Sequence, residues 1–302
     1  MKTKNNEKLI AVIGATGQQG GGVVRALQAS GQFKVRAVTR NPAKHRELAD
    51  EVVEADLNRP ETLKAAFEGA YGVFLVTNFQ ESGTNEFKQA IAAVRAAKDA
   101  GVKHFVWSTL PDVEEISGGK FDVPHFTGKA RIDSIVKAAG FASHTFVIAP
   151  FYYQNLVGAF GPQKQADGSL GWAVPLDPDV RCIHMGDITE LGNIVTGAFL
   201  HADQVGNGEY LPLVGDFMSF NEIVKTLNRQ GHEFSVKQVP KELFATFFPG
   251  AAEIAVMFSY FQAHTYLGSD SSNRIALANK IAGRQPTGFS TWARLNVPVQ
   301  NP

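Results

Sequence analysis

The sequence has almost no cysteine, no excess of charge of either sign and no long apolar run. Its 302 residues include one cysteine, Cys182, so no disulfide can form within the chain. A disulfide-based secreted scaffold is therefore excluded. Lysine plus arginine and aspartate plus glutamate each number 29. The chain thus lacks the overall positive charge with which nucleic-acid-binding proteins hold phosphates, and we expect no nucleic acid partner.

Other absences argue against a membrane protein and a metalloprotein. No apolar run reaches the length of about 18 residues that a membrane span needs, and the polar start "MKTKNNEK" lacks the apolar core of a signal peptide. We therefore expect a cytoplasmic protein. The histidines and Cys182 have no zinc-type spacing, so no metal site is expected. A small buried residue is the expected role of Cys182, with a redox thiol as the alternative.

Strand-like apolar runs alternate with amphipathic, helix-like runs through the first half of the chain. Strands are expected at 8–13, 34–39, 52–55, 71–76, 103–108 and 143–149, and helices at 18–30, 42–49, 60–68, 85–100 and 127–139. Apolar strands that alternate with helices indicate a parallel sheet covered on both faces. We therefore predict the α/β class, with a doubly wound parallel sheet of the Rossmann type.

The pattern changes after Pro150. A loop region rich in Gly, Pro and Asp is followed by strand-like "RCIHM" and a helix that Asp187 is expected to N-cap. Residues 216–302 look mostly helical and aromatic, and core packing is the expected use of "FSYFQAHTYLG", with a ligand pocket as the alternative. We predict a Rossmann core over 1–150, completed by about 180–215, and a smaller, mainly helical lobe over 151–302 that covers the strand ends.

Three glycines follow the first predicted strand and open the first predicted helix. A helix that begins in such a turn directs backbone N–H groups and the positive end of its dipole at one point. Gly14 would make the tight turn, Gly17 would let a pyrophosphate approach the backbone, and Gly20 would let helix and strand pack closely. The spacing Gly-x-x-Gly-x-x-Gly predicts a phosphate site. The alternative is a turn without a ligand.

The end of the second predicted strand indicates which dinucleotide would bind. An NAD-binding protein usually has Asp or Glu there to accept a hydrogen bond from the ribose 2′-hydroxyl. This chain has Arg40 there, with Lys44 about one turn later. Two cations suit a 2′-phosphate and hence NADP, and a solvated arginine is the alternative. Asp56 and Leu57, just past the third strand, would contact the adenine.

With these residues in place, the chain resembles the NmrA-like branch of the atypical short-chain dehydrogenase/reductase superfamily. The similar segments are "VIGATGQQGGGVVRAL", "RAVTRNP", "ADLNRPETLKAAFEGAYGVFLVTN", "HFTGKARID", "APFYYQNL" and "QPTGFSTWARL". The chain most closely resembles the redox-sensor type of this family, in which NADP(H) binding regulates shape and partner choice. The resemblance implies an NADP(H)-binding sensor or regulator with weak or no dehydrogenase activity. It also leaves room for a regulatory protein partner and a homodimer.

The resemblance also implies roles for individual residues. The phosphate loop and 2′-phosphate clamp would be formed by Gly14, Thr16, Gly17, Gln18, Gln19, Gly20, Arg40 and Lys44. The adenine pocket and the floor after the fourth strand would be formed by Asp56, Leu57, Thr77, Asn78 and Phe79, with Lys88 as a further candidate. The nicotinamide side would be formed by Lys129, Tyr152, Tyr153, Gln154 and Asn155.

Whether the chain is an enzyme is left open by the sequence. Reductases of the wider superfamily use a Tyr-x-x-x-Lys pair, and here His125 stands in the place of the tyrosine, four residues before Lys129. His125 is a candidate proton donor and Ser108 a candidate polarising group. In the alternative, His125 packs the helix start and Lys129 holds the ribose. A catalytic role would make the chain an NADPH-dependent reductase of a small carbonyl compound or quinone, with Tyr152 or Tyr153 as other candidate donors.

Overall fold

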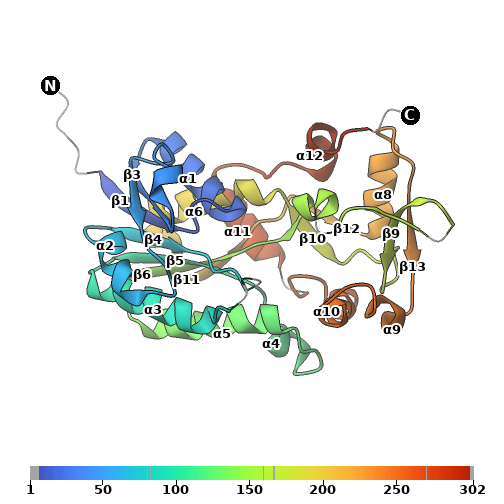
Figure 1. Cartoon of the computed structure of the whole chain (residues 1–302), viewed down its shortest axis with the longest axis horizontal. Coiled ribbons are helices and arrows are strands. Elements are labelled where there is room, and N and C mark those ends of the chain that lie inside the picture. Colours follow the sequence, from blue (N-terminus) through green and yellow to red (C-terminus); the bar gives the residue numbers. More distant parts are fainter. Residues whose placement is uncertain are drawn as a thin grey trace.

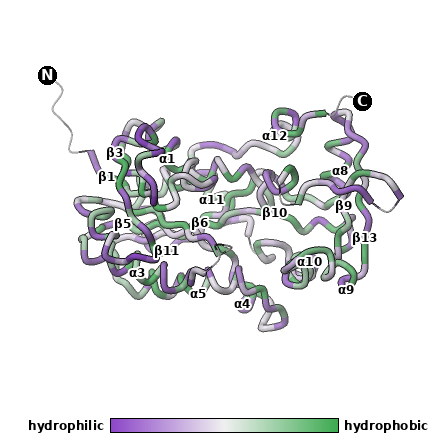
Figure 2. Tube along the Cα trace, in the orientation of Figure 1, coloured by the Kyte–Doolittle hydropathy of each residue, from purple (hydrophilic) through white to green (hydrophobic). Residues whose placement is uncertain are grey.

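The chain forms an α/β half and a C-terminal lobe that lie side by side along the longest axis (Figure 1). The structure is a computed structural model, and it describes residues 7–79, 81, 83–158, 160–165, 167–269 and 271–299. In the trace coloured by hydropathy, both halves carry hydrophobic stretches in their interior (Figure 2). Among the helices of the described residues, none has the length and apolar character that crossing a membrane requires.

A parallel sheet forms the centre of the α/β half. Within the described residues it has seven strands in the order β11-β6-β5-β4-β1-β2-β3. The strands are β1 (Lys8–Ile13), β2 (Phe33–Thr39), β3 (Glu51–Glu54), β4 (Gly72–Leu75), β5 (His104–Thr109), β6 (Ser143–Ile148) and β11 (Asn207–Pro212). The chain runs outward from β1 to β3 and then crosses to β4 on the other side of β1. Ligands of such sheets bind at this switch point, beyond the carboxyl ends of the strands.

Helices cover both faces of the sheet, as predicted. In β1, Ile10 and Val12 face one buried core, whereas Ala11 and Ile13 face the other. The first core is shared with α1 (Gln18–Ser30), α6 (Leu191–Leu200) and α11 (Ser272–Ala282). The second core is shared with α2 (Leu63–Phe67), α3 (Glu86–Asp99) and α5 (Pro124–Ala138). The doubly wound Rossmann architecture is therefore confirmed.

One predicted helix in this half is wrong beyond its first turn. Residues 42–49 form only the 3₁₀ turn η1 (Pro42–Lys44), whereas the second short helix consists of η2 (Pro60–Thr62) followed by α2. The chain must reach β3 at Glu51, and Asp50 already accepts a hydrogen bond from the backbone N–H of Val35 on β2 (2.8 Å). This contact fixes Asp50 beside β2, so the chain approaches β3 in turns instead of a continued helix.

The lobe contains helices, as predicted, and also strands, of which the sequence indicated only the one at "RCIHM", confirmed as β10 (Ile183–Gly186). In its described part, two three-stranded sheets join β7 (Phe151–Tyr152), β10 (Ile183–Gly186) and β12 (Asp216–Met218), and β8 (Gln163–Lys164), β9 (Leu170–Val174) and β13 (Phe234–Gln238). The helical elements of the lobe are α4 (Val113–Ser117), η3 (Tyr153–Val157), α8 (Phe220–Asn228), α9 (Lys241–Phe244), α10 (Ala251–His264) and α12 (Phe289–Asn296), whereas η4 (Ile188–Glu190) and α7 (Ala202–Val205) pack on the α/β half.

Side chains of the aromatic stretch pack into the core of the lobe. Phe258, Tyr260 and Phe261 are fully buried on α10. Cys182 lies in the same core, and burial raises the pKa of its thiol to about 12, which fits the packing role expected from the sequence. Later segments also return to the α/β half, because β11, α6 and α11 complete it. The division into domains at residue 150 stays a prediction.

Candidate functional site

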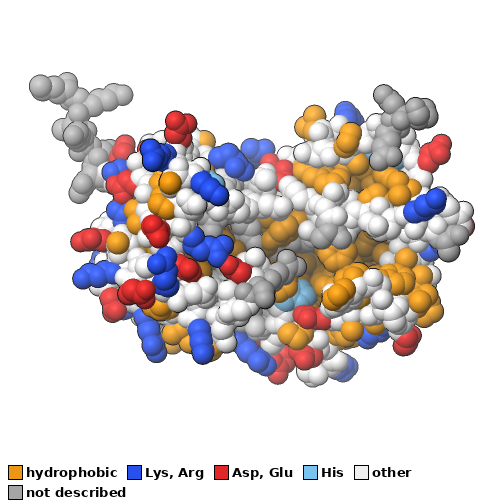
Figure 3. Space-filling model, in the orientation of Figure 1, with side chains coloured by type: hydrophobic (Ala, Val, Ile, Leu, Met, Phe, Trp, Pro, Cys, Tyr) orange, Lys and Arg blue, Asp and Glu red, His pale blue; other side chains and the backbone are white. Residues whose placement is uncertain are grey.

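A cavity of about 1080 Å³ lies at the carboxyl ends of the central strands and extends to the lobe. Figure 3 shows this face of the molecule hollowed between the two halves. The volume lies at the upper end of the usual range for ligand pockets, about 300–1,000 Å³. Predicted site residues that line the cavity are Gly14, Thr16, Gly17, Gln18, Gln19, Gly20, Arg40, Asp56, Leu57, Thr77, Asn78, Phe79, Ser108, His125, Lys129, Tyr152 and Asn155.

Four other predicted residues are not among the described residues that line the cavity. Lys44 and Lys88 are exposed, on η1 and α3. The hydroxyl of buried Tyr153 donates a hydrogen bond to the Asp216 carboxylate (2.9 Å). Gln154 donates from Nε2 to Oδ1 of Asp187 (2.6 Å).

Asp187 also accepts a hydrogen bond from the backbone N–H of Thr189 (2.9 Å), which caps η4. The capping role expected for Asp187 is therefore confirmed. Since Gln154 bonds to the capping carboxylate, its side chain supports this turn, which packs against α1 of the α/β half.

The glycines of the first turn differ in what their surroundings require. Gly14 has φ +74°, and a Cβ there would lie 2.7 Å from Cγ1 of Val76. A Cβ on Gly20 would lie 2.1 Å from the carbonyl oxygen of Gly14. At Gly17 the nearest described atom would be that same oxygen, at 3.3 Å. Close packing thus explains why Gly14 and Gly20 carry no side chain. It does not explain Gly17, where the absence of a side chain leaves the backbone open to a ligand.

The start of α1 offers polar backbone groups to this part of the cavity. Gly17 is the N-cap of α1, and none of the described side chains caps this helix end. The first N–H groups of a helix have no partner within the helix, and they attract anions. The residues present therefore fit a pyrophosphate at this position.

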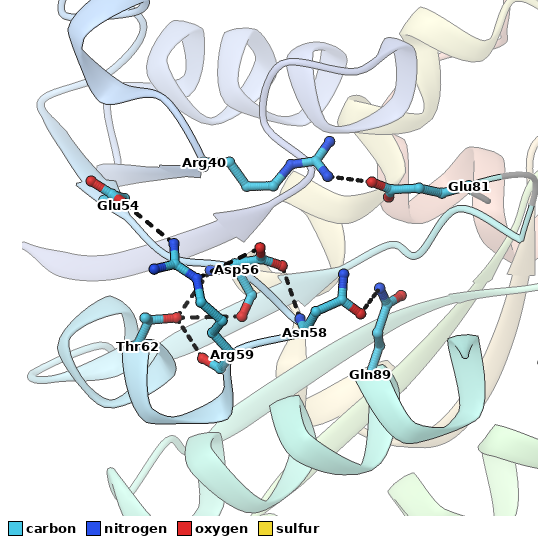
Figure 4. Close-up of polar contacts among 8 residues, drawn as sticks. All are labelled: Arg40, Glu54, Asp56, Asn58, Arg59, Thr62, Glu81 and Gln89. Atoms are coloured by element: carbon cyan, nitrogen blue, oxygen red, sulfur yellow. Dashed lines mark hydrogen bonds and ion pairs between the residues drawn. The ribbon is translucent and has the colours of Figure 1, made fainter. Parts of the chain in front are cut away.

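Arg40 forms an ion pair with Glu81 across the cavity. Its guanidinium joins the segment after β2 to the segment after β4 (Figure 4). Both residues line the cavity, and the Arg40 side chain is 62% exposed. Nearby, the carboxylate of Asp56 accepts a hydrogen bond from the backbone of Asn58 (2.9 Å) and lies 3.7 Å from Nε of Arg59. Glu81 and Arg59 were not predicted from the sequence.

A chain of hydrogen bonds crosses the middle of the cavity. Ser108 donates from Oγ to Oε1 of Gln19 (2.6 Å), and Nε2 of Gln19 donates to the hydroxyl oxygen of Tyr152 (2.7 Å). Burial raises the pKa of Tyr152 to about 12, so this phenol keeps its proton at neutral pH. The side chain of Gln19, predicted in the phosphate loop, therefore lies between the two residues predicted near the nicotinamide.

Lys129 is buried and held by an acidic partner that was not predicted. Its ammonium donates to the Glu86 carboxylate (2.6 Å), to the carbonyl oxygen of Thr77 (3.0 Å) and to the Thr77 hydroxyl (3.1 Å). Burial lowers the pKa of Lys129, and the charge of Glu86 opposes this shift. Acidic residues are common in the first turn of a helix, so the sequence position of Glu86 did not indicate its contact with Lys129.

His125 is paired with an acid from the lobe. Nδ1 of His125 lies 2.5 Å from Oε1 of Glu253, and the backbone N–H of His125 donates to the same oxygen (3.2 Å). The imidazole is stacked on Phe79, with ring centroids 4.8 Å apart. Glu253 is on α10, and the sequence signal for it was one acid inside the apolar run "AAEIAVMFSYF".

Three titratable side chains follow one face of α5 at intervals of four residues. His125 and Lys129 line the cavity, and Asp133 lies deeper in the α/β half. The Asp133 carboxylate accepts hydrogen bonds from the indole of Trp107 (3.0 Å) and the hydroxyl of Tyr210 (2.9 Å). Burial nevertheless raises the pKa of Asp133 to about 7. Among the described residues, no group of three or more His, Cys, Asp or Glu side chains could hold a metal ion.

Comparisons with known proteins identify the family. A family model described as the NmrA-like family matches residues 6–293. The chain belongs to the NmrA-like family. An NmrA-like family domain-containing protein of Dictyostelium discoideum is 33% identical over 236 residues, which are 74% of this chain and 77% of that protein. An oxidoreductase of the same family from Aspergillus hancockii is 32% identical and covers 88% of this chain and 87% of its own.

Solved structures support the fold of this NmrA-like protein. NmrA, a negative transcriptional regulator, has been solved in complex with NAD (TM-score 0.80) and with NADP (TM-score 0.79). Each is 24% identical and covers 97% of this chain and 96% of its own. An NADPH-dependent quinone oxidoreductase from Escherichia coli, complexed with NADPH, is 20% identical with a TM-score of 0.75 and covers 94% and 98%.

Proposed function

We propose that this NmrA-like protein binds NADP(H), with the pyrophosphate at the start of α1 and the 2′-phosphate at Arg40. The observation that carries the proposal is the position of Arg40, an exposed guanidinium at the end of β2 that lines the cavity. A 2′-phosphate at this place can accept paired, charge-assisted hydrogen bonds from an arginine. The NAD and NADP complexes named for NmrA support a dinucleotide at this site.

The other contacts follow the length of the cavity. Asp56 and Leu57 would contact the adenine side, and Lys129, Tyr152 and Asn155 the nicotinamide side. When bound, the nicotinamide supplies a hydride or accepts one. Lys44 and Lys88 stay candidate contacts from the surface, and Tyr153 and Gln154 would act indirectly, through their hydrogen bonds to Asp216 and Asp187.

We further propose that the chain is a regulator of the redox-sensor type, which responds to the level of NADP(H) with the Arg40–Glu81 ion pair as the switch, since the 2′-phosphate is common to NADP⁺ and NADPH. A 2′-phosphate competes with the Glu81 carboxylate for the same guanidinium, so NADP(H) binding releases Glu81 from Arg40. NAD(H) lacks that phosphate and leaves the ion pair in place. The cofactor thereby favours one arrangement of the segments after β2 and β4, as a ligand with differential affinity does. A regulatory protein partner would bind the altered surface, and a homodimer stays a prediction.

Hydrogen exchange tests the switch directly. Amide exchange of peptides that contain Glu81 or Arg40 is measured without cofactor, with NADP⁺ and with NAD⁺, each at saturation. We expect NADP⁺ to change exchange in the Glu81 peptides beyond the effect of NAD⁺. In Glu81→Gln, the two cofactors should act alike on these peptides. Equal exchange in the wild type with and without NADP⁺, at proven saturation, contradicts the sensor.

A reductase is the second candidate function, and one observation favours it. The cavity does not end at Tyr152 and Asn155 but continues to Phe248, Ile254 and Met257 of the lobe. This space would admit a second molecule beside the nicotinamide. Several relatives bear the name oxidoreductase. Oxidation of NADPH that requires an added carbonyl compound or quinone would distinguish the reductase from a protein that only binds the cofactor.

A further inference from the structure

The lobe end of the cavity is lined by apolar and aromatic side chains. We call it the lobe chamber and define it by Phe126, Phe151, Phe160, Phe248, Ile254, Met257 and Tyr266. Hydrophobic side chains gather on the lobe side of the hollow in Figure 3, whereas many of the lysines and arginines on this face lie over the α/β half. Aromatic rings and a methionine favour flat, uncharged aromatic ligands. With Glu253 beside the chamber, an anionic ligand is disfavoured.

One polar side chain beside this chamber has an atom left for a ligand. His125 is held at Nδ1 by Glu253, and one face of its ring is stacked on Phe79. Phe126 meets the ring edge to face, with centroids 4.9 Å apart. These three contacts fix the plane of the imidazole. Its other nitrogen, Nε2, has no hydrogen bond to any residue that the structure describes, and His125 lines the cavity.

The other candidate acids around the cavity are already occupied. The Lys129 ammonium is paired with Glu86, and the phenol of Tyr152 is bonded to Gln19. The hydroxyl of Tyr153 faces Asp216, whose charge together with burial raises the pKa of Tyr153 far above its ordinary value. His125 is the member of this set with both an acidic partner on one nitrogen and an unengaged nitrogen on the other.

A histidine held in this way matches both members of a carbonyl–alcohol couple. The imidazolium donates from Nε2 to a carbonyl oxygen, and the neutral ring accepts at Nε2 from the product hydroxyl. In both states Nδ1–H donates to Glu253, so the ring need not turn when the proton moves. Glu253 is 36% exposed while His125 is 10% exposed, which gives the buried imidazole a carboxylate in contact with water.

We infer that His125, positioned by Glu253, is the proton donor for reduction of a planar aromatic carbonyl compound bound in the lobe chamber. The inference rests on the NADP(H) binding proposed above. The carbonyl carbon accepts a hydride, its π electron pair moves to the oxygen, and the oxygen takes the Nε2 proton of His125. One NADPH is oxidised for each alcohol formed, and His125 recovers its proton from water beside Glu253.

The test uses the full chain with 4-nitrobenzaldehyde and 9,10-phenanthrenequinone as probes. NADPH oxidation and the affinity for NADP⁺ are measured for wild type, His125→Asn and Glu253→Gln, with half-buried His201→Asn and exposed Glu114→Gln, which do not line the cavity, as controls. We expect His125→Asn to lower kcat about 100-fold, the usual minimum contribution of general acid catalysis, with NADP⁺ affinity unchanged. Glu253→Gln should lower kcat with little change in KM, and Glu253→Asp should restore part of the loss. The two controls should match wild type.

Probe binding gives a readout that does not depend on turnover. Calorimetry with 9,10-phenanthrenequinone in the presence of NADP⁺ should show binding to wild type and at least tenfold weaker binding to Met257→Trp, in which the indole fills the chamber. Turnover retained in His125→Asn overturns the inference. So does a wild-type protein that binds NADPH but neither binds nor reduces the two probes, and this result leaves the proposed cofactor binding intact. Failure to bind NADPH contradicts the proposed function itself.

Discussion

The two ends of the cavity are built from different parts of the chain. At the phosphate end, the lining comes from the single turn 14–20 and from residues at the ends of β2 and β3. At the lobe end, it comes from residues such as Phe126, Phe160, Phe248 and Tyr266, which are spread over more than a hundred positions of the chain. Backbone atoms shape the first end, since a Cβ on Gly20 would lie 2.1 Å from the Gly14 carbonyl. Side chains shape the second. Substitutions of the glycines at the first end should therefore affect folding, and side-chain substitutions at the second should affect ligands.

One face of α5 connects the two ends of the cavity. It carries the basic side chains of two pairs, each with an acidic partner, that differ in how far they are buried. The Lys129–Glu86 pair has side-chain exposures of 7% and 13%, whereas those of His125 and Glu253 are 10% and 36%. A buried pair that loses one member leaves an uncompensated charge away from water. A pair that reaches water is screened, and its loss is tolerated. Burial thus decides which pair holds the fold and which is available for chemistry.

The largest loss of stability expected from a single substitution comes from splitting the buried pair. Glu86→Gln should lower the free energy of unfolding by about 3 kcal/mol, because it leaves the Lys129 ammonium buried without a counter-charge. Glu253→Gln, the matched change at the lobe end, should cost less than about 1 kcal/mol. Urea denaturation of both variants measures the difference. Equal losses of unfolding free energy in the two variants would contradict the claim that only the buried pair holds the fold.

The stability of the chain should also depend on pH through Asp133, which lies further along α5. Its pKa is about 7 in the folded chain against an ordinary 3.8. Between these values the folded chain holds a proton that the unfolded chain has released, so stability falls as pH rises from about 4 to 7. Three pKa units correspond to at most about 4 kcal/mol. Asp133→Asn should flatten this slope in urea denaturation, while exposed Asp99→Asn should leave it unchanged. An unchanged slope in Asp133→Asn contradicts the assignment.

A smaller effect is expected from adding one methyl group at the phosphate end. Gly20→Ala should lower the free energy of unfolding by about 2 kcal/mol, because its Cβ would overlap the backbone of Gly14. Gly128→Ala, in the middle of α5 with no described atom within 4 Å of its Cβ, should be neutral or stabilising by up to about 1 kcal/mol. Thermal unfolding of the two variants compares them. Similar behaviour would show that close packing is not the reason for Gly20.

The fold could be predicted from the sequence because its signals are local. Six strands of the central sheet, including β1 (Lys8–Ile13), were visible as short apolar runs, whereas β11 (Asn207–Pro212) was not predicted as a strand. The helix predicted at 42–49 failed because a contact with the neighbouring strand, between Asp50 and Val35, overrode local propensity. The strands β12 and β13 pair with segments far away in the chain, and no local pattern announces such pairing.

The candidate site divides in the same way. Residues of the glycine turn and of the strand ends could be named because their spacing carries the signal. The partners Glu81, Glu86 and Glu253 could not, because each meets its basic partner residue only after the chain has folded. Gln19 was predicted for its backbone position in the turn, and the sequence gave no sign that its side chain would join Ser108 to Tyr152.

The central claim is that Arg40 makes this protein select NADP(H). Calorimetric titration of wild type, Arg40→Gln and Arg59→Gln with NADP⁺ and NAD⁺ tests it most directly. Charge-assisted hydrogen bonds contribute about 1.5–3 kcal/mol, so wild type should bind NADP⁺ at least about tenfold more tightly than NAD⁺. Arg40→Gln should lose that preference, and Arg59→Gln should keep it. Equal affinity for the two cofactors in wild type, or a preference that survives Arg40→Gln, would contradict the account.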